Sequence, residues 1–255
     1  MLLYKGHNKD RTLDSSYRTI STCPLFAKGL DLYVRDLNIG KWNSKQAPTQ
    51  FQGAGSSHEL ASLCITEAIQ YSKYITKEPI FLLFLDAKSA FDSVIIKYLV
   101  RNLYLSGTEA NSLLYMENRL ANRVSFCEFD KILVGPVYDE LGLEQGGISS
   151  SDGYKIYNNE LLELVQNSEL GVQMGDHLVL SGVGQADDTG LLANDLDKLN
   201  HLLQLALSYC TKYNVELSTS KTKLMKISPT RKETIETFNP VNIGGKTIKF
   251  VGQAE

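Results

Sequence analysis

The sequence has few of the features that mark membrane, secreted or disulfide-stabilised proteins. Its longest unbroken apolar run, Ile80 to Leu85, ends at Asp86 and is far shorter than the roughly 20 residues that a transmembrane helix needs. The first four residues lead directly into Lys5, so no apolar signal segment is recognised. The four cysteines form no Cys-x-x-Cys pair. We therefore expect reduced thiols in an intracellular protein, nuclear or cytoplasmic and without a membrane partner, that has neither a disulfide framework nor a zinc knuckle.

Neither sign of charge is in large excess. The 255 residues include 26 Lys and Arg and 29 Asp and Glu, and 43% of all residues are hydrophobic, which is an ordinary globular composition. The charge is unevenly distributed: residues 1–45 and 201–255 each carry a net +4, whereas residues 137–200 carry −10. A polyanion would bind the two ends, because phosphate affinity comes from Lys and Arg. The acidic middle would repel it unless divalent cations lay there, and solvated helix faces are the alternative explanation.

Apolar periodicity and β-forming runs predict a mixture of helices and strands. Helices are predicted over Leu25–Asn38, Ser57–Ile75, Phe91–Leu103, Glu109–Ala121, Ser150–Val165 and Leu196–Tyr213. Strands are predicted over Ile80–Leu85, Arg123–Val134 (a strand or hairpin), Leu178–Val183, Gly190–Ala193, Lys223–Ser228 and Lys246–Val251. Because strands and helices do not alternate strictly, the fold class is predicted to be α+β with an antiparallel sheet.

Two acidic sites stand out at the ends of apolar segments. Asp86 closes the predicted strand from Ile80, and Asp187 and Asp188 lie at the tip of a predicted hairpin. A carboxylate beside a buried strand needs a partner, whereas adjacent Asp residues in a turn are by themselves more often turn formers than ligands. An antiparallel sheet could bring Asp86 beside the hairpin tip, where the carboxylates would repel one another unless metal ions intervened. Oxygen ligands without His or Cys suit Mg²⁺ or Mn²⁺, and a pair of such ions serves phosphoryl transfer.

The segment from Phe84 to Asp92 resembles the F-x-D-x-x-x-A-F-D signature of reverse transcriptases, particularly those of non-LTR (LINE-type) retrotransposons. Further blocks resemble the family's motifs in its order along nearly the whole chain. They are Tyr17–Ser21 (Y-R-P-I-S), Gln50-Phe51 with Gly55-Ser56-Ser57 (Q-F-G-F-R-x-G-R-S-T), Gln145–Ser149 (P-Q-G-S-P-L-S), Gln185–Asp188 (Y-A-D-D), Lys221–Lys223 (K-T-K) and Phe250–Gly252 (Y-L-G). Glu144 and Gln185 stand where the family has Pro and Tyr.

The resemblance implies roles for particular residues. Asp86, Asp187 and Asp188 would bind the two metal ions, with the Ala87 carbonyl as a further ligand, and Lys221 would donate a proton to the leaving pyrophosphate. Among the substrate-binding residues, Phe91 would be the steric gate against the sugar 2′-hydroxyl, and Lys5 and Arg18 would contact the triphosphate. Gln145 and Gly146 would contact template and nucleotide, and Gln185 would contact the primer end. The primer grip would be Phe250, Val251 and Gly252. Without the resemblance, Phe91 would be assigned to the core, and Arg18 and Lys221 to the solvated surface.

The resemblance also implies an architecture and a reaction. Residues 1–255 would form the fingers and palm of a right-handed polymerase, with the palm sheet packed on helices and the thumb missing. Residues 1–79 would be mostly fingers and 80–255 mostly palm, with some fingers elements in 108–140. The domain would use an RNA template, a DNA primer and dNTPs. The alternatives are a decayed or domesticated nucleic-acid-binding remnant, and a palm-like cyclase or metal phosphohydrolase.

Overall fold

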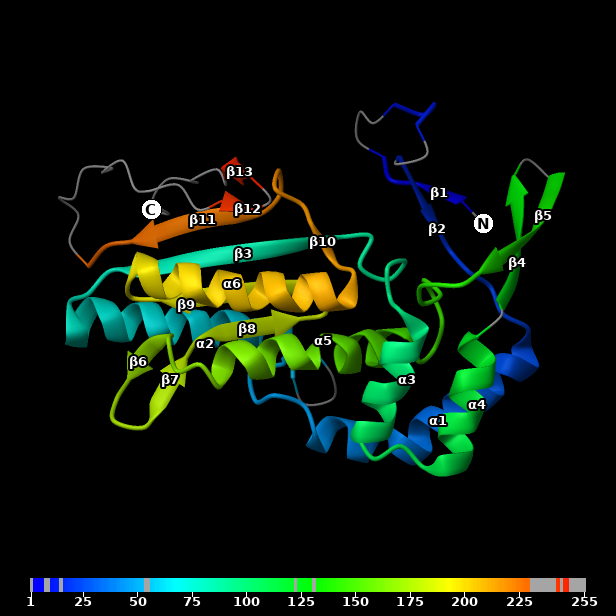
Figure 1. Cartoon of the computed structure of the whole chain (residues 1–255), viewed down its shortest axis with the longest axis horizontal. Coiled ribbons are helices and arrows are strands. Elements are labelled where there is room, and N and C mark those ends of the chain that lie inside the picture. The colour runs from blue at the N-terminus through cyan, green and yellow to red at the C-terminus, as the bar shows by residue number, and fades with distance from the viewer. Residues whose placement is uncertain are drawn as a thin grey trace. The chain divides into compact units, whose positions relative to one another are not determined.

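The computed structural model describes most of the chain (Figure 1). The residues described are 2–6, 10–13, 16–52, 56–121, 123–129, 132–229, 242–243 and 245–247. The chain divides into two compact units, and each is described by itself. The first unit consists of Met1–Lys45 and Phe91–Tyr157, and the second of Gln46–Ala90 and Asn158–Glu255.

The second unit contains an antiparallel sheet built on one long central strand. The strand order is β10-β3-β9-β8. Strand β10 pairs with the last two residues of β3, and β11 pairs with its first five residues. The strands are β3 (Ile80–Lys88), β8 (Gly182–Gln185), β9 (Asp188–Ala193), β10 (Glu216–Leu217) and β11 (Lys223–Ile227). Successive side chains of a strand point to opposite faces, and Ile80, Leu82, Leu83 and Leu85 are all buried. The centre of the sheet is therefore covered on both faces.

Helices α2 (His58–Tyr71) and α6 (Leu196–Tyr213) supply much of this cover. Ser57 caps α2 by accepting a hydrogen bond from the Leu60 amide, and Asp195 caps α6 by accepting from Asp197 and Lys198. Ala61 and Ala68 of α2 pack on the sheet, and α6 packs against β3 and β9. The remaining elements assigned to the second unit are the C-terminal half of α5, a π-helical turn and two short hairpins: α5 (Ser150–Gln166), η2 (Ser72–Thr76), β6 (Val172–Met174) with β7 (Leu178–Leu180), and β12 (Asn242–Ile243) with β13 (Lys246–Thr247).

The first unit is a group of helices with two hairpins. Its elements are α1 (Leu25–Ser44), α3 (Ile96–Leu105), α4 (Ala110–Leu120), the start of α5, β1 (Leu2–Tyr4) with β2 (Tyr17–Thr19), and β4 (Arg123–Phe129) with β5 (Ile132–Asp139). The fully buried Trp42 donates from its indole nitrogen to Thr108 Oγ1 at 2.8 Å. Asn38 Oδ1 accepts from the Glu109 amide at 2.9 Å. Polar bonds thus attach α1 to the connection between α3 and α4.

The α+β class with an antiparallel sheet is confirmed, as are the helices α1, α2, α4, α5 and α6, the strands β3, β9 and β11, and the hairpin β4–β5 that the sequence predicts. The single strand predicted over Leu178–Val183 is wrong: the structure has two strands there, β7 and β8, because β7 pairs with β6 and β8 pairs with β9 in a different sheet. Asp86 does not close its strand: β3 continues to Lys88 because β10 pairs with its last residues. Nor does the next helix begin at Phe91. It begins at Ile96, because the carbonyls of Phe91 and Val94 accept hydrogen bonds from Leu143 and Gly142 instead of forming a helical ladder.

Other differences concern short elements. Asp188 is the first residue of β9 and does not lie at the hairpin tip, which is formed by Ala186 and Asp187. Strands β1, β2, β6, β10 and β12 have two or three residues each and carry too little pattern for a prediction. Only Lys246–Thr247 of the predicted last strand is described, and its remainder lies outside the described residues.

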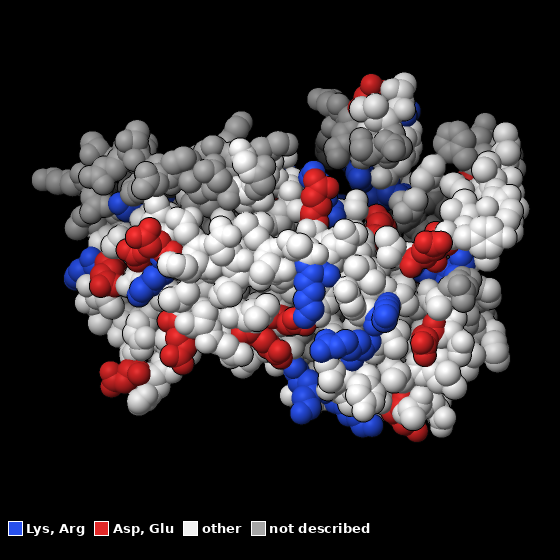
Figure 2. Space-filling view, viewed as in Figure 1, with Lys and Arg blue, Asp and Glu red and all other residues white. Residues whose placement is uncertain are grey.

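On the face shown in Figure 2, basic and acidic side chains are interspersed. Among the described residues, no helix combines the length and the apolarity needed to cross a lipid bilayer.

Candidate active site

Two of the three predicted metal-binding carboxylates lie opposite each other in the sheet of the second unit. Asp86 of β3 is the register partner of Asp188 of β9. The third, Asp187, precedes Asp188 in the two-residue turn between β8 and β9, where Ala186 has a φ of +57°. The apolar β3 run and the β8–β9 hairpin place the three carboxylates at one end of the sheet.

The carboxylates crowd one another electrostatically. The pKa of Asp188 is raised, first because its carboxylate is partly desolvated although the residue is exposed by surface area, and then by the charges of Asp187 and Asp86. Lys221 opposes this rise in pKa. Oδ2 of Asp86 is buried and accepts no hydrogen bond from the described residues, although it forms an ion pair with Lys221. This end of the sheet therefore carries an excess of negative charge.

Lys221 is the cation nearest to Asp86 among the ion pairs of the described residues. Its Nζ lies 3.2 Å from each carboxylate oxygen of Asp86, and its side chain is 69% exposed. Hydrogen bonds of its neighbours hold the segment of Lys221 beside Asp86: the Asp86 carbonyl accepts from the Ser218 amide at 2.7 Å, and the Asp86 amide donates to the side-chain oxygen Oγ1 of Thr222 at 3.4 Å. Sequence reasoning missed Ser218 and Thr222 as supports of the site. The only signal was the position of Thr222 within the Lys-Thr-Lys block.

The carboxylates of Asp86, Asp187 and Asp188 are ligands of the kind that a hard divalent cation binds. Within the described part of the chain, no group of three or more His, Cys, Asp or Glu side chains is arranged to hold a metal ion. The available donors are carboxylate oxygens, and one of them, Oδ2 of Asp86, is buried without a hydrogen bond. Mg²⁺ and Mn²⁺ prefer such ligands. An ion bound here would compete with Lys221 for the Asp86 carboxylate.

The first unit brings together a second set of predicted residues. Gln145 and Gly146 form a turn in which the Gln145 carbonyl accepts from the Ser21 amide at 2.9 Å. Gly146 has a φ of +102°, which favours glycine. Gln145 Nε2 donates to Asp92 Oδ1 at 3.3 Å, next to Phe91. The turn and Phe91 are therefore neighbours in one unit.

Phe91 lies in a turn with its ring stacked on Tyr154, and the ring centroids are 5.0 Å apart. Arg18 lies on β2, Lys5 follows β1, and both are exposed. Ala87 is the register partner of Leu217.

Gln185 pairs with Asp188, and its side-chain oxygen is buried without a hydrogen bond from the described residues. The predicted primer grip, Phe250, Val251 and Gly252, lies outside the described residues.

Replacing Asp188 by Asn should raise the melting temperature of the metal-free protein at neutral pH. Because the folded-state pKa of Asp188 lies above its ordinary value of 3.8, ionising this group disfavours folding. That cost is full above the folded-state pKa and vanishes as the pH falls below 3.8. The gain in melting temperature should therefore shrink on acidification. Asp176→Asn, in the exposed β6–β7 turn, is the control, and equal gains for both variants would contradict the crowding of the carboxylates.

Comparison with known proteins identifies the family of the chain and solved structures with a similar fold. The family model described as reverse transcriptase (RNA-dependent DNA polymerase) matches residues 7–254. No protein among those with curated descriptions matches the sequence.

Solved telomerase structures share the fold. Apo telomerase from Candida tropicalis matches 78% of this chain and 37% of its own chain, with a TM-score of 0.56 and 13% identity. Telomerase from Candida albicans in complex with a TWJ fragment of telomeric RNA matches 87% of this chain and 36% of its own, with a TM-score of 0.54 and 12% identity. The chain thus spans about a third of the length of these telomerase chains, and at this identity the likeness concerns the fold alone.

Proposed function

The chain belongs to the reverse transcriptase family, and we propose that it extends a DNA primer by copying an RNA template. The observation that supports this most is the register of the sheet, which sets Asp86 opposite Asp188 with Asp187 in the adjoining turn. The order of the sequence blocks along the chain supports it further. In the proposed reaction the primer 3′-hydroxyl attacks the α-phosphorus of a dNTP and pyrophosphate leaves.

Within this proposal the residues of the chain have separate tasks. Asp86, Asp187 and Asp188 would hold two Mg²⁺ or Mn²⁺ ions. Such ions lower the pKa of the attacking hydroxyl and neutralise charge on the phosphates when bound. Lys221, whose ammonium lies 3.2 Å from Asp86, would give a proton to the leaving pyrophosphate. Its high exposure leaves it able to reach a bound substrate.

The substrate side of the proposal rests on the first unit. The Gln145–Gly146 turn would contact template and nucleotide, Arg18 and Lys5 the triphosphate, and Phe91 the sugar. We propose that residues 1–79 serve mostly as fingers and residues 80–255 mostly as palm, with some fingers elements in 108–140. The motif Phe84–Asp92 also supports an origin in a non-LTR retroelement.

The proposed function is tested by primer extension on an RNA template with dNTPs and either Mg²⁺ or Mn²⁺. Extension that needs template, primer and metal together is the expected result. Binding of primer and template without extension, in folded protein, would favour the nucleic-acid-binding remnant. A cyclic nucleotide or released phosphate made without primer would favour the cyclase or phosphohydrolase.

Phe91 provides a test of substrate choice. Replacing it by Val should lower the ratio of dNTP to rNTP incorporation about tenfold or more, because a smaller side chain leaves room for a 2′-hydroxyl. Phe91 is partly buried, and Val keeps more of its packing than Ala would because it retains two methyl groups. The measurement is single-nucleotide incorporation with matched dNTP and rNTP. Tyr154→Leu, which removes the ring stacked on Phe91, shows how far looser packing alone changes the ratio. An unchanged ratio in folded Phe91→Val would remove Phe91 from the nucleotide site.

A further inference from the structure

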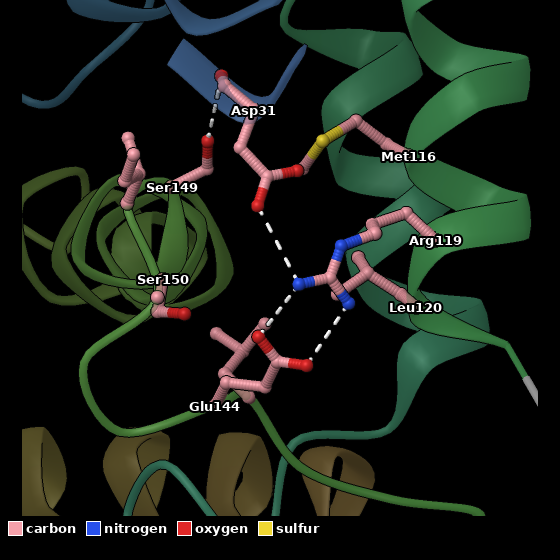
Figure 3. Close-up of a pocket in the computed structure, with 10 residues that line it drawn as sticks. Asp31, Met116, Arg119, Leu120, Glu144, Ser149 and Ser150 are labelled. Atoms are coloured by element: carbon pink, nitrogen blue, oxygen red, sulfur yellow. Dashed lines mark hydrogen bonds and ion pairs between the residues drawn. The ribbon is translucent and has the colours of Figure 1, made fainter. Parts of the chain in front are cut away.

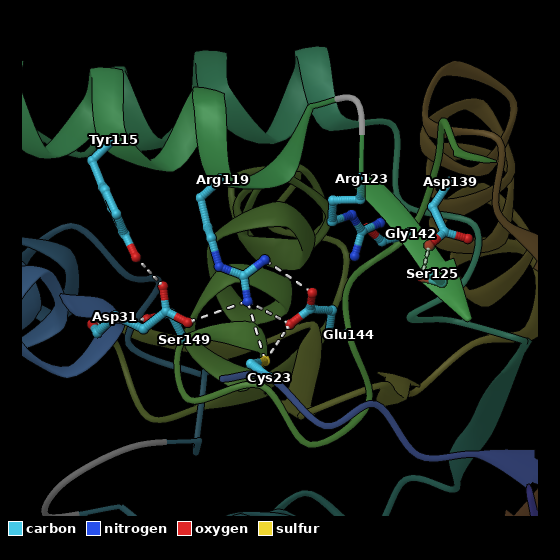
Figure 4. Close-up of polar contacts among 10 residues, drawn as sticks. All are labelled: Cys23, Asp31, Tyr115, Arg119, Arg123, Ser125, Asp139, Gly142, Glu144 and Ser149. Carbon is cyan, nitrogen blue, oxygen red and sulfur yellow. Dashed lines mark hydrogen bonds and ion pairs between the residues drawn. The ribbon is translucent and has the colours of Figure 1, made fainter. Parts of the chain in front are cut away.

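A partly buried ion-pair cluster surrounds Arg119 in the first unit (Figures 3 and 4). Arg119, on α4, donates from Nη1 to Glu144 Oε1 at 2.9 Å and from Nη2 to Oε2 at 2.7 Å. Nη2 also lies 3.5 Å from Asp31 Oδ2 on α1. The side chains of Arg119 and Glu144 are each 19% exposed, and that of Asp31 is 7% exposed. A two-pronged arginine–carboxylate pair is among the strongest and most directional polar contacts in proteins.

Two further side chains complete the cluster. Cys23 Sγ donates to Glu144 Oε2 at 3.0 Å, and Tyr115 donates to Asp31 Oδ1 at 2.7 Å. Burial would raise the pKa of Glu144, but the hydrogen bonds from Arg119 and Cys23 together with the positive charges of Arg119 and Arg123 outweigh it, and the net shift of the pKa is downward. The pair is therefore ionised at neutral pH.

The cavity beside this cluster, lined in part by Asp31, Arg119, Glu144 and Ser149, has a volume of about 20 Å³. That is room for about one water molecule. The cluster therefore acts on its neighbours in the chain and does not form a pocket for a substrate.

The cluster is joined directly to the turn that carries Gln145 and Gly146. Glu144 is the residue before this turn, and its carbonyl accepts from the Gly147 amide at 3.0 Å. The Ser21 amide donates to the Gln145 carbonyl at 2.9 Å. Ser21 lies two residues before Cys23, so the segment preceding α1 is tied to the turn both through its backbone and through the cluster.

The preceding residues of the same loop are anchored as well. Arg123 donates from Nη2 to the carbonyls of Leu141 at 2.8 Å and Gly142 at 2.6 Å. The Leu143 amide donates to the Phe91 carbonyl at 2.7 Å. Gly142 has a φ of +86°, and a Cβ there would lie 2.9 Å from the Asp92 carbonyl oxygen. The loop thus packs closely on the turn that carries Phe91.

We propose that Arg119 is a positioning residue for nucleotide binding: by holding Glu144 it fixes the Gln145–Gly146 turn and, through Leu143, the backbone at Phe91. This inference rests on the proposed function, which gives the turn and Phe91 their roles. The competing explanation is that the cluster stabilises the fold of the first unit and nothing else. The two explanations differ in whether the loss of Arg119 changes the order of the Gln145–Gly146 turn and the binding of nucleotide, or only the stability of the first unit.

Hydrogen–deuterium exchange separates them without any need for activity. Arg119→Gln and Glu144→Gln should each speed exchange at the loop amides about tenfold or more, since each variant removes the two-pronged ion pair that holds Glu144. Arg35→Gln is the matched control, because it removes another arginine–carboxylate ion pair of the same unit, at 2.6 Å, whose partner Asp152 is not a member of the cluster. It should leave the same amides within about twofold of wild type. The amides to follow are those whose hydrogen bonds hold the loop: Ser21, Gly142, Leu143 and Gly147. Wild-type exchange at these amides in both charge-removing variants would overturn the proposal.

Kinetics test the consequence for the substrate. Arg119→Gln should raise the KM for dNTP about tenfold while kcat changes less than about threefold, and Arg119→Lys should restore part of the loss because it keeps the charge without the two-pronged bond. If Arg119→Gln does not fold, Arg119→Lys carries both measurements. An unchanged KM in folded variants would contradict the proposal. A wild-type protein without incorporation would instead contradict the proposed function, and the exchange rates would still decide whether Arg119 orders the loop.

Discussion

Asp187→Ala is expected to abolish nucleotide incorporation while leaving the fold intact. Asp187 is exposed in the β8–β9 turn, next to the Asp86–Asp188 pair, so its side chain is available for cations and is not needed for packing. Loss of one metal-binding carboxylate should cost several kcal/mol of transition-state stabilisation, or roughly a thousandfold or more in rate. Metal-free stability should stay level or rise, because one of three mutually repelling charges is gone.

The experiment compares single-nucleotide incorporation and melting temperature for wild type, Asp187→Ala and Asp176→Ala. Asp176 is the matched control, since it also lies exposed in a hairpin turn of the second unit, between β6 and β7. The control should incorporate at the wild-type rate. Incorporation by Asp187→Ala at that rate would contradict the assignment of Asp187 to the metal ions.

Lys221→Met is expected to lower kcat about a hundredfold, the lower range for loss of a general acid. An alternative role for Lys221 is to balance the negative charge of Asp86, because its Nζ lies 3.2 Å from that carboxylate. Lys221→Arg distinguishes the two roles. Arginine keeps the positive charge but does not release a proton at neutral pH. It should therefore be nearly as slow as Lys221→Met if Lys221 is the proton donor.

Single-turnover rates with saturating dNTP measure this effect on the chemical step. Lys223→Met is the control from the same Lys-Thr-Lys block, where the Lys223 ammonium donates to the Ser220 carbonyl at 2.9 Å. It should react at close to the wild-type rate. Full activity in Lys221→Arg would show that only the charge at this position matters.

The sequence predicts those parts of the fold that depend on local pattern. The apolar run of β3 and the capped helices α2 and α6 combine periodicity with terminal signals such as Ser57 and Asp195. The start of α3 was misplaced because Phe91 and Val94 continue its apolar periodicity. Their carbonyls instead bond the loop at Gly142 and Leu143, and that long-range pairing leaves no trace in the local pattern.

The candidate site, like the fold, could be predicted from local pattern only in part. Acidic residues beside apolar strands indicated where charge would gather, but the register that pairs Asp86 with Asp188 joins strands about a hundred residues apart. The strand pattern showed that an antiparallel sheet could bring Asp86 beside the hairpin tip, and the resemblance to a family supported this, but local pattern alone could not fix the register. The roles of the individual site residues remain predictions that the experiments above test.

The cluster around Arg119 could not be predicted, because its members come from three segments that are far apart in the sequence: residues 23–31, α4 and the loop before α5. In the sequence Glu144 is only a departure from the family's Pro, and Cys23 is one thiol among four without spacing. The contacts of Arg119 with both of them arise only when α4, the segment before α1 and the loop before α5 meet in the first unit.

The central claim, that this chain copies RNA into DNA, is tested most directly by exchanging the templating base. RNA templates that differ only at the first unpaired position are annealed to the same DNA primer, and each dNTP is supplied alone with Mg²⁺ or Mn²⁺. The account predicts that only the complementary dNTP is added efficiently, that its identity changes with the templating base, and that Asp187→Ala adds none. Addition independent of the templating base, or no addition by folded wild-type protein that binds the duplex, would contradict it.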